Sequence, residues 1–597
     1  MANNISFERT NGFFNQFLIS VNMFKKINFI AALFVIASAV YSQAQLAYLN
    51  KSGAAPKLIV DGKPFIILGG ELHNSTGSDK EAMAKVWKEM KALNLNTVLA
   101  YAYWELLEPQ EGKFNFDLVD EAILGAQKEN LKLVLVWFGA WKSTSSTYVP
   151  EWVKTNPNRF QRHTLADGKT LEMLSPFSEE NRNADAKAYM ALMQHLKDFD
   201  KNHTVIMTQI ENEPGCFENY RDLSPAAQKV WQNPMSNDMV NYLKTNKGKL
   251  FPALEKAWAD NGNKTKGTWE EILGKSTDQG EYKFYTEELF MAYNYSKYIN
   301  FLAEKGKKIH NLPAFCNGWL YNKRGTYPHG TINPHVMDAY KAGGTSMDFY
   351  SPNVYTIEYD ELFDAYTFGG NTLFIPESSL MPAGALYAIG KYNALGFAPF
   401  GIDGEKMKSN ENINNLNLLK STYKSISEMT SIISQNYGTE KLKGVYLNPN
   451  KERQEVKMGD YKLAATSSRK PGFSIDFGKS LENAGKARMS FGPPTDAKEE
   501  KPKPVPASPF GPLPEEIGSA IIIQNTDNEF FIVGYGVKMD FALNEGIAFN
   551  HLGFLSIDEG YFENDKFVAT KRWNGDEQKV SLPGDKITTL KVRLYRN

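Results

Sequence analysis

Residues 204–215 read TVIMTQIENEPG, and this stretch decides how the fold is interpreted. Residues 204–211 form a short, mostly apolar run, which is typical of a strand buried on both faces of a parallel sheet. The strand ends at once, because Pro214 and Gly215 interrupt it. Glu211, Asn212 and Glu213 therefore fall at the carboxyl end of a buried strand.

Similar apolar runs recur between residues 57 and 405, and amphipathic helical patterns such as 80–93, 116–129 and 184–200 alternate with them. This alternation is typical of βα units around a parallel sheet. Eight strands over roughly 350 residues predict an α/β fold, a (β/α)8 or TIM barrel with insertions. The predicted strands are 65–71, 97–104, 132–138, 204–211, 313–317, 348–353, 372–377 and 397–401.

The chain divides into regions of different pattern. Its 597 residues are too many for one hydrophobic core, so two or three domains are expected. We expect 45–420 to form the barrel, with a mostly helical insertion at about 216–275 that either walls the barrel mouth or is a surface elaboration. Short runs at close spacing predict a β-sandwich-like domain over 421–597. These runs are 444–447, 472–477, 520–524, 530–533 and 588–594, and the Pro-rich segment 493–516 is expected to be a loop.

The N-terminal residues resemble a secretory signal. Lys25 and Lys26 precede an apolar run at 29–40, and residues 42–44 read SQA, a pattern typical of signal cleavage sites. We expect translation to start at Met23 and residues 1–44 to be a signal peptide region, so that the protein is exported to the periplasm or beyond. The alternative is an N-terminal membrane anchor, although the run is short for a bilayer span and no span is expected in the mature protein.

Composition narrows the class of partner. The formal net charge of −1 gives no basic face for nucleic acid or anionic membrane, so a neutral partner such as a carbohydrate fits better. With two cysteines and no histidine pair at metal spacing, no disulfide framework, metal site or cofactor is expected. Cys216 and Cys316 are either free buried thiols or one bridge.

Acidic residues end two of the predicted strands. Glu213 follows the fourth strand and Glu377 ends the seventh, and these strands lie on opposite sides of an eight-stranded barrel mouth. Glycoside cleavage needs two carboxyl groups that flank the glycosidic oxygen, about 5–5.5 Å apart in a retaining enzyme. We predict Glu213 as acid/base and Glu377 as nucleophile. Taken alone, the Asn-Glu-Pro sequence is equally explained as a turn after a strand.

Neighbouring residues suggest supporting roles. The Asn212 amide is placed to bond the sugar 2-hydroxyl, and strand alternation predicts that Glu211 lies below Glu213 and helps to keep it protonated. Tyr355 follows the sixth strand and is the predicted phenolic partner of Glu377, or else a loop aromatic. Four tryptophans gather at strand ends, and one or two of them are expected to stack on sugar. They are Trp104, Trp137, Trp141 and Trp319.

Several motifs resemble glycoside hydrolase family 35, the β-galactosidases of clan A, in a bacterial branch with an extra C-terminal β-domain. Residues 68–73 read LGGELH, similar to the family's G-E-x-H opening. Residues 101–116 read YAYWELLEPQEGKFNF, similar to its E-P-x-x-G-x-[YF]-x-F segment, and QIENE at 209–213 completes the set. The resemblance covers about 55–405. It implies a retaining exo-β-galactosidase in which Tyr101 lies beside the sugar.

This sequence departs from that family in two places. Glu105 stands where the family has Asn after Trp104, and residues 137–142 read WFGAWK, where the family has C-A-E-W and where this chain is more similar to family 42. We expect Trp137 and Trp141 to contact substrate, and Glu71 and His73 to bind sugar or brace Glu213. Glu108 is expected to shape the loop after the second strand.

Three functions remain open at this point. The first is a β-galactosidase acting on oligo- or polysaccharides. The second is another clan A enzyme with the same carboxylates: a β-glucosidase, an arabinopyranosidase or an endo-glycanase. The third is an exported carbohydrate-binding protein without activity. Serine hydrolysis is disfavoured, because no G-x-S-x-G occurs.

Overall fold

The computed structural model describes residues 45–276, 286–319, 327–410, 412–468, 517–547 and 551–596. Ala47–Asn597 form one unit, separate from Met1–Leu46. The expected signal region 1–44, the strand expected at 472–477 and the loop expected at 493–516 lie outside the described residues. Within the described part of the chain, no helix has the length and apolar character needed to cross a bilayer.

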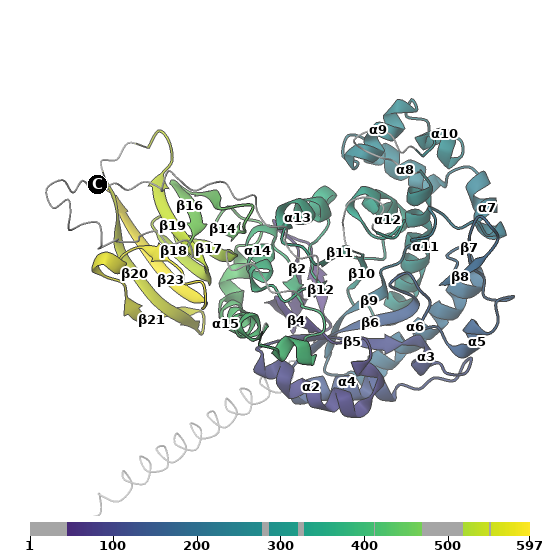
Figure 1. The fold of residues 1–597 in the computed structure, drawn as a ribbon, viewed down its shortest axis with the longest axis horizontal. Helices are drawn as coiled ribbons and strands as arrows, with labels where there is room; N and C mark the ends of the chain where they lie inside the picture. The colour runs from purple at the N-terminus through teal and green to yellow at the C-terminus, as the bar shows by residue number, and fades with distance from the viewer. Residues whose placement is uncertain are drawn as a thin grey trace, which may run out of the picture. The chain divides into compact units, whose positions relative to one another are not determined.

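Eight parallel strands form the barrel, and they follow one another around the sheet in chain order (Figure 1). They are β4 (Ile67–Glu71), β5 (Thr97–Tyr103), β6 (Lys132–Lys142), β9 (Val205–Asn212), β10 (Ala314–Gly318), β11 (Phe349–Val354), β12 (Glu377–Ser378) and β13 (Gly396–Phe397). β13 pairs with β4, and Ile375 forms a parallel bridge with Phe397 that joins the seventh strand to the eighth. The predicted α/β barrel is confirmed.

Helices cover the outside of the barrel and return the chain from one strand to the next. The longer ones are α2 (Lys80–Ala92), α4 (Asp117–Lys128), α6 (Glu179–Phe199), α11 (Thr286–Ile309), α13 (Tyr359–Thr367), α14 (Pro382–Tyr392) and α15 (Ile413–Gln435). Side-chain caps fix where two of these helices begin. The Asp79 carboxylate accepts a hydrogen bond from the Ala82 N–H at the start of α2, and the Ser178 hydroxyl accepts one from the Asn181 N–H at the start of α6. α15 crosses residue 420, where the barrel domain was expected to end.

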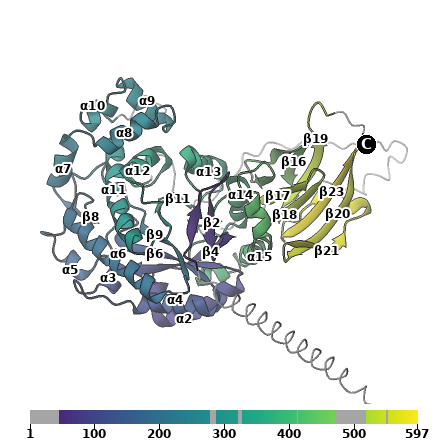
Figure 2. The same ribbon diagram turned by 180° about the vertical axis from the view of Figure 1, so that it is seen from behind.

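Short elements connect these parts. They are β1 (Tyr48–Asn50), β2 (Lys57–Val60), β3 (Lys63–Phe65), α3 (Trp104–Leu107), α5 (Glu151–Lys154), β7 (Arg162–Thr164), β8 (Thr170–Leu174) and α12 (Met337–Gly343). Helices occupy the insertion after β9, as Figure 2 shows from behind: α7 (Pro225–Gln232), α8 (Asn237–Thr245), α9 (Pro252–Asp260) and α10 (Trp269–Leu273). Cys216 and Cys316 are free, buried thiols.

Two antiparallel sheets form the C-terminal domain. The first contains β14 (Leu442–Leu447), β17 (Gly518–Thr526), β18 (Glu529–Tyr535), β23 (Thr588–Arg596), β20 (Leu552–Glu563) and β21 (Lys566–Arg572). The second contains β15 (Arg453–Met458), β16 (Tyr461–Ser467), β19 (Val537–Leu543) and β22 (Val580–Ser581). Leu463 and Met539 from one sheet and Ile522 and Ile532 from the other belong to one buried core, so the two sheets form a sandwich.

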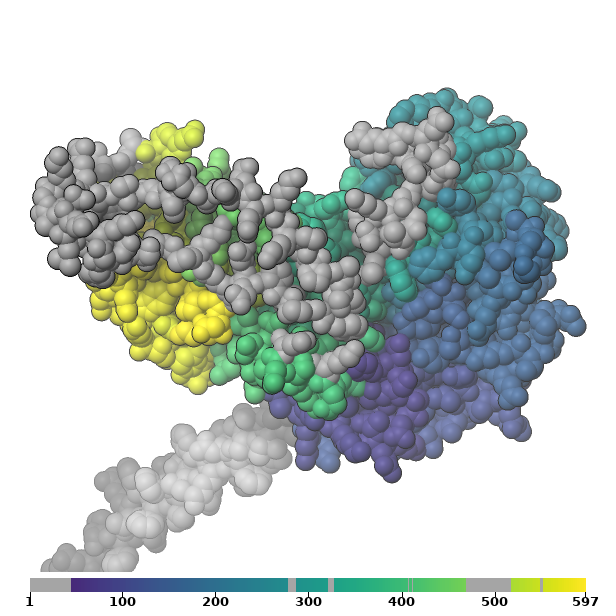
Figure 3. All heavy atoms as spheres, in the orientation of Figure 1, coloured from purple at the N-terminus to yellow at the C-terminus, as the bar shows by residue number. Residues whose placement is uncertain are grey.

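The sandwich packs directly on the barrel's last helices. A Cβ on Gly390 of α14 would lie 3.0 Å from the Gly444 Cα of β14, so glycine at this contact lets helix and strand approach closely. The Tyr446 hydroxyl donates to the Ile357 carbonyl at 2.9 Å. In the space-filling view, green barrel residues and yellow sandwich residues lie against each other (Figure 3).

Candidate active site

Glu213, directly after β9, and Glu377, in the short strand β12, meet at the barrel mouth, as the sequence predicts for strands four and seven. One side-chain amide holds both: the Asn353 Nδ2 donates to Glu213 Oε1 at 2.5 Å and to Glu377 Oε2 at 2.9 Å. The two oxygens are therefore no more than 5.4 Å apart, the sum of 2.5 Å and 2.9 Å. Both side chains are buried, and this separation fits the spacing of a retaining carboxylate pair.

Each carboxylate has its own further donors. The Tyr355 hydroxyl donates to Glu377 Oε1 at 2.6 Å, so the predicted partnership of Tyr355 with Glu377 is present. The Ser143 hydroxyl bonds Glu213 Oε2 at 2.9 Å, and the Lys142 ammonium lies 3.8 Å from the same oxygen. Both acids are thus fixed in orientation by groups from the ends of β6 and β11 and the loops after them.

The electrostatics favour one shared proton. Burial, and then the negative charge of Glu213, raise the pKa of Glu377 to about 7, against the opposing effects of Lys142 and of the bonds from Tyr355 and Asn353. Two carboxyl groups this close cannot both ionise easily. Near neutral pH the pair can therefore hold one protonated and one ionised member, which is the state that acid-assisted nucleophilic attack requires.

This raised pKa leads to a stability prediction for Glu377→Gln. Between about pH 4.5 and 7 the folded chain keeps a proton at Glu377 that the unfolded chain has lost, so stability falls as pH rises through this window. The neutral amide of the glutamine cannot ionise, so the Glu377→Gln variant does not lose stability in this way. At pH 8 we expect the free energy of unfolding of Glu377→Gln to exceed that of the native chain by on the order of 3 kcal/mol at most, seen as a higher Tm, with little difference at pH 4.5. An equal Tm difference at both pH values would contradict the buried charge.

Glu71 and Asn212 lie deeper in the same site. The Tyr101 hydroxyl lies 3.1 Å from Glu71 Oε1 and donates to the Leu72 carbonyl at 2.5 Å, while Glu71 Oε2 is buried without a partner. Burial, and then the charge of Glu377, raise the pKa of Glu71 well above its usual range. Both side-chain atoms of Asn212 are also buried and unpartnered. Unsatisfied buried polar groups of this kind fit a polyhydroxylated ligand.

The prediction that Trp137 and Trp141 contact substrate is wrong for this structure. The Trp137 indole N–H donates to Asp185 of α6, and the Trp141 indole N–H donates to the Leu174 carbonyl. Trp141 also packs on Tyr295 and Tyr298 of α11, and both tryptophans are fully buried. Their strand, β6, turns alternate side chains outward toward the helices, and these two are on the outer face.

Glu211 also differs from expectation. Its backbone adopts a positive φ of 62°, which breaks the strand alternation that would place it below Glu213. Its carboxylate instead accepts from the N–H groups of Ala140 and Trp141 at 3.1 and 2.6 Å. Glu211 thus joins β9 to β6, and burial, followed by Asp185, raises its pKa well above the usual range.

The remaining predicted residues have structural partners. The His73 Nδ1 lies 2.9 Å from Asp403 Oδ1, and its side chain is half exposed, so Asp403 orients the ring. The Glu108 carboxylate accepts from the Trp104 indole and from the Gly112 N–H, which shapes the loop after β5 as predicted. Trp104 is therefore packing, not an exposed platform.

Sequence reasoning missed Lys142, Ser143 and Asn353. The third strand was expected to end at 138, but β6 continues to Lys142 and carries its side chain into the site. The position of Asn353 at the end of the sixth strand was the available signal for its role. Asn317 supports the same network: its Oδ1 accepts from the Glu213 N–H at 3.2 Å and its Nδ2 donates to Asn353 at 3.0 Å.

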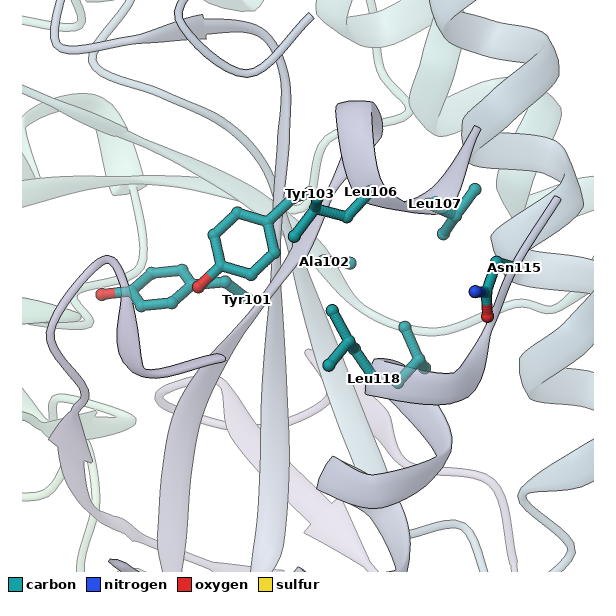
Figure 4. Close-up of a pocket in the computed structure, with 8 residues that line it drawn as sticks. Tyr101, Ala102, Tyr103, Leu106, Leu107, Asn115 and Leu118 are labelled. Atoms are coloured by element: carbon teal, nitrogen blue, oxygen red, sulfur yellow. The ribbon is translucent and has the colours of Figure 1, made fainter. Parts of the chain in front are cut away.

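A separate small cavity lies on the helix side of β5 and contains none of these acids. Figure 4 shows apolar side chains, including Leu106, Leu107 and Leu118, with Asn115 at one edge. It has no convergent charged group, so it offers no chemistry. Within the described residues, no group of three or more His, Cys, Asp or Glu side chains is arranged to hold a metal ion.

Parts of this chain are similar in sequence to known β-galactosidases. Residues 74–360 match glycoside hydrolase family 42, described as Beta-galactosidase, and residues 419–582 match a domain of unknown function. Beta-galactosidase of Xanthomonas manihotis is 38% identical over 172 residues, which are 27% of this chain and 26% of that protein. Beta-galactosidase 11 of Arabidopsis thaliana is 29% identical over 163 residues, 26% of this chain and 18% of that protein.

The chain thus spans about a quarter or less of the length of these relatives. Among solved structures, the β-galactosidase of Bacillus circulans sp. alkalophilus is 16% identical with a TM-score of 0.43, covering 62% of this chain and 57% of that one. The β-galactosidase of the haloarchaeon Halorubrum lacusprofundi is 14% identical with a TM-score of 0.41, covering 60% of this chain and 58% of that one. The sequence matches thus show that residues 74–360, within the barrel, are similar to β-galactosidases.

Proposed function

We propose that this chain is a retaining exo-β-glycosidase that releases terminal β-D-galactosyl residues from oligo- or polysaccharides. The observation that supports it most is the Asn353 amide, which holds oxygens of Glu213 and Glu377 within 5.4 Å of each other, the sum of 2.5 Å and 2.9 Å. That spacing suits a nucleophile and an acid on one sugar and leaves too little room for the attacking water of an inverting enzyme. The match over 74–360 favours family 42 over family 35 for the barrel.

In this proposal, ionised Glu377 attacks the anomeric carbon while Glu213 gives its proton to the glycosidic oxygen. A covalent α-galactosyl ester forms on Glu377 and the aglycone leaves. Glu213, now ionised, takes a proton from water, and the resulting hydroxide displaces Glu377 to release β-galactose. The Tyr355 and Asn353 donors stabilise Glu377 whenever it is a carboxylate, both before attack and as it leaves.

A screen of 4-nitrophenyl glycosides tests the substrate class. We expect the β-D-galactoside to be cleaved with the highest kcat/KM, ahead of the β-D-glucoside and the α-L-arabinopyranoside. Preference for either of those two would move the assignment to another clan A enzyme, and cleavage of internal bonds in a polymer would indicate an endo-glycanase. Binding without cleavage of any glycoside would indicate a carbohydrate-binding protein.

Replacing Asn353 with Ala should impair both halves of the reaction. The change removes one donor from each acid and frees their relative orientation, so we expect kcat to fall about 10- to 100-fold. Steady-state kinetics on the β-galactoside measures this, with Tm as the check on folding. A folded Asn353→Ala enzyme with native kcat would show that this amide does not organise the pair.

We also propose that the protein is exported, because residues 25–44 combine two lysines, a short apolar run and a small-residue cleavage pattern. Cell fractionation should then find the mature protein in the periplasm or medium with its N-terminus near Gln45. Full-length protein in the cytoplasm would contradict export.

A further inference from the structure

Lys142 brings a positive charge to the two acids, although it takes no direct part in bond making or breaking in the proposed mechanism. Its ammonium lies 3.8 Å from Glu213 Oε2 and donates to the Ser143 hydroxyl at 2.7 Å, which in turn bonds Glu213 at 2.9 Å. The Phe138 ring lies below it, 5.7 Å from the ammonium. Lys142 is therefore held against Glu213 both directly and through one hydroxyl.

A strained turn fixes this arrangement. Ser143 and Thr144 both adopt positive φ, 48° and 67°, which non-glycine residues rarely do. Their N–H groups donate to the carbonyls of Asn212 and Glu213, each at 3.2 Å. Glu213 itself has a φ of 51°. The turn after β6 thus hydrogen-bonds the backbone of Glu213, and the Ser143 side chain in the same turn hydrogen-bonds its carboxylate.

We propose that Lys142 is a positioning residue that sets the protonation of the Glu213–Glu377 pair, with its ammonium stabilising Glu213 after that side chain has given up its proton. This rests on the proposed glycosidase function. When Glu213 protonates the leaving group, a buried carboxylate is created beside a second carboxyl that has become a neutral ester. Lys142 is the positive charge that compensates this carboxylate until water supplies the proton that returns Glu213 to the acid form.

The surrounding groups make this role electrostatic. Burial lowers the pKa of Lys142, but the charges of Glu213 after β9, Glu377 of β12 and Glu71 of β4 together outweigh it, so the pKa is raised and Lys142 stays charged. The phenol of Tyr148 also faces it, while Tyr101 and Tyr355 face the acids. Among the described residues that bond Glu213 and Glu377, Asn353, Tyr355 and Ser143 are neutral donors, so losing the Lys142 ammonium removes the positive charge beside the acids.

The test compares Lys142→Met with Lys142→Arg. Without the positive charge both acids hold protons more tightly, so both limbs of the kcat/KM–pH profile of Lys142→Met should move to higher pH, by about one unit or more. Lys142→Arg should keep both limbs near their native positions. A Lys142→Met profile with native limbs, including one with only a raised KM, would overturn the proposal, since it would make Lys142 a ligand contact or a packing residue.

A second measurement needs no substrate. The Tm of the native chain and of Lys142→Met is followed from pH 5 to 9; we expect the deficit of Lys142→Met to grow with pH, as uncompensated carboxylates ionise. A deficit that is constant with pH would overturn the proposal. If the native enzyme cleaves no glycoside, the proposed function fails, and this stability comparison still decides whether Lys142 controls the pair.

Discussion

Replacing Glu377 with Ala is expected to reduce turnover of β-galactosides by at least about 10⁴-fold while the protein stays folded. Asn353 and Tyr355 both donate to this carboxylate, and Glu213 lies beside it, so its removal takes away the group that these residues hold in place. Truncation also leaves space beside the anomeric carbon. Azide should enter that space, attack from the same face and restore turnover with α-galactosyl azide as the product.

Nuclear magnetic resonance of the azide product decides the role of Glu377. A β-galactosyl azide would place the lost carboxylate on the acid/base side and exchange the two roles. Glu105→Ala is the matched control, because Glu105 also follows a barrel strand, β5, but pairs with Lys154 and both side chains are partly exposed. We expect native kinetics for this control, and an equal loss in it would point to general damage of the barrel mouth.

Replacing Glu213 with Ala should give a loss that depends on the leaving group. A 2,4-dinitrophenyl galactoside needs no proton to depart, so its glycosylation step should be nearly native, whereas an alkyl galactoside should lose about 10²- to 10⁴-fold. The basic limb of the pH profile should disappear, because the group whose ionisation causes it is absent. Azide should accelerate the second step and give β-galactosyl azide, the opposite anomer from the Glu377→Ala product.

Rates on the two substrates and the configuration of the azide product check this prediction. An equal loss on activated and unactivated galactosides would mean that Glu213 does not act as the acid. Ser143→Ala serves as a comparison, since it removes one bond to Glu213 Oε2 and keeps the carboxyl group. Its loss should be smaller and should not depend on the leaving group in the same way.

Much of the fold follows from the sequence because strands buried on both faces have a distinctive pattern. The predicted run 97–104 corresponds to β5 (Thr97–Tyr103), and 348–353 to β11 (Phe349–Val354), within one residue at each end. The two acids were found for the same reason. Parallel strands bring their carboxyl ends to one face, so chain positions far apart become neighbours in a way that strand order alone predicts.

From sequence alone, some side chains of the third strand were assigned to the wrong face of the barrel sheet. Ending the third strand at 138 placed Trp137 and Trp141 at the mouth, whereas β6 runs to Lys142 and alternation turns both indoles toward the helices. The same alternation carries Lys142 inward. A strand's end depends on its neighbours' hydrogen bonds, which local sequence does not show.

Backbone strain is the second feature that sequence could not supply. Glu211 and Glu213 both adopt positive φ, so the regular alternation assumed for them does not hold. Such conformations persist only when surrounding contacts impose them, here the bonds from Ala140 and Trp141 to Glu211. The supporting role of Glu211 was therefore predicted for the wrong partner.

The pairing of Glu213 as acid/base with Glu377 as nucleophile is tested most directly by the configuration of the sugar at the moment of release. Proton nuclear magnetic resonance of a 4-nitrophenyl β-galactoside digest should show β-galactose first, with the α anomer growing only as mutarotation proceeds. Initial release of α-galactose would mean inversion, and a double displacement through Glu377 would then be excluded.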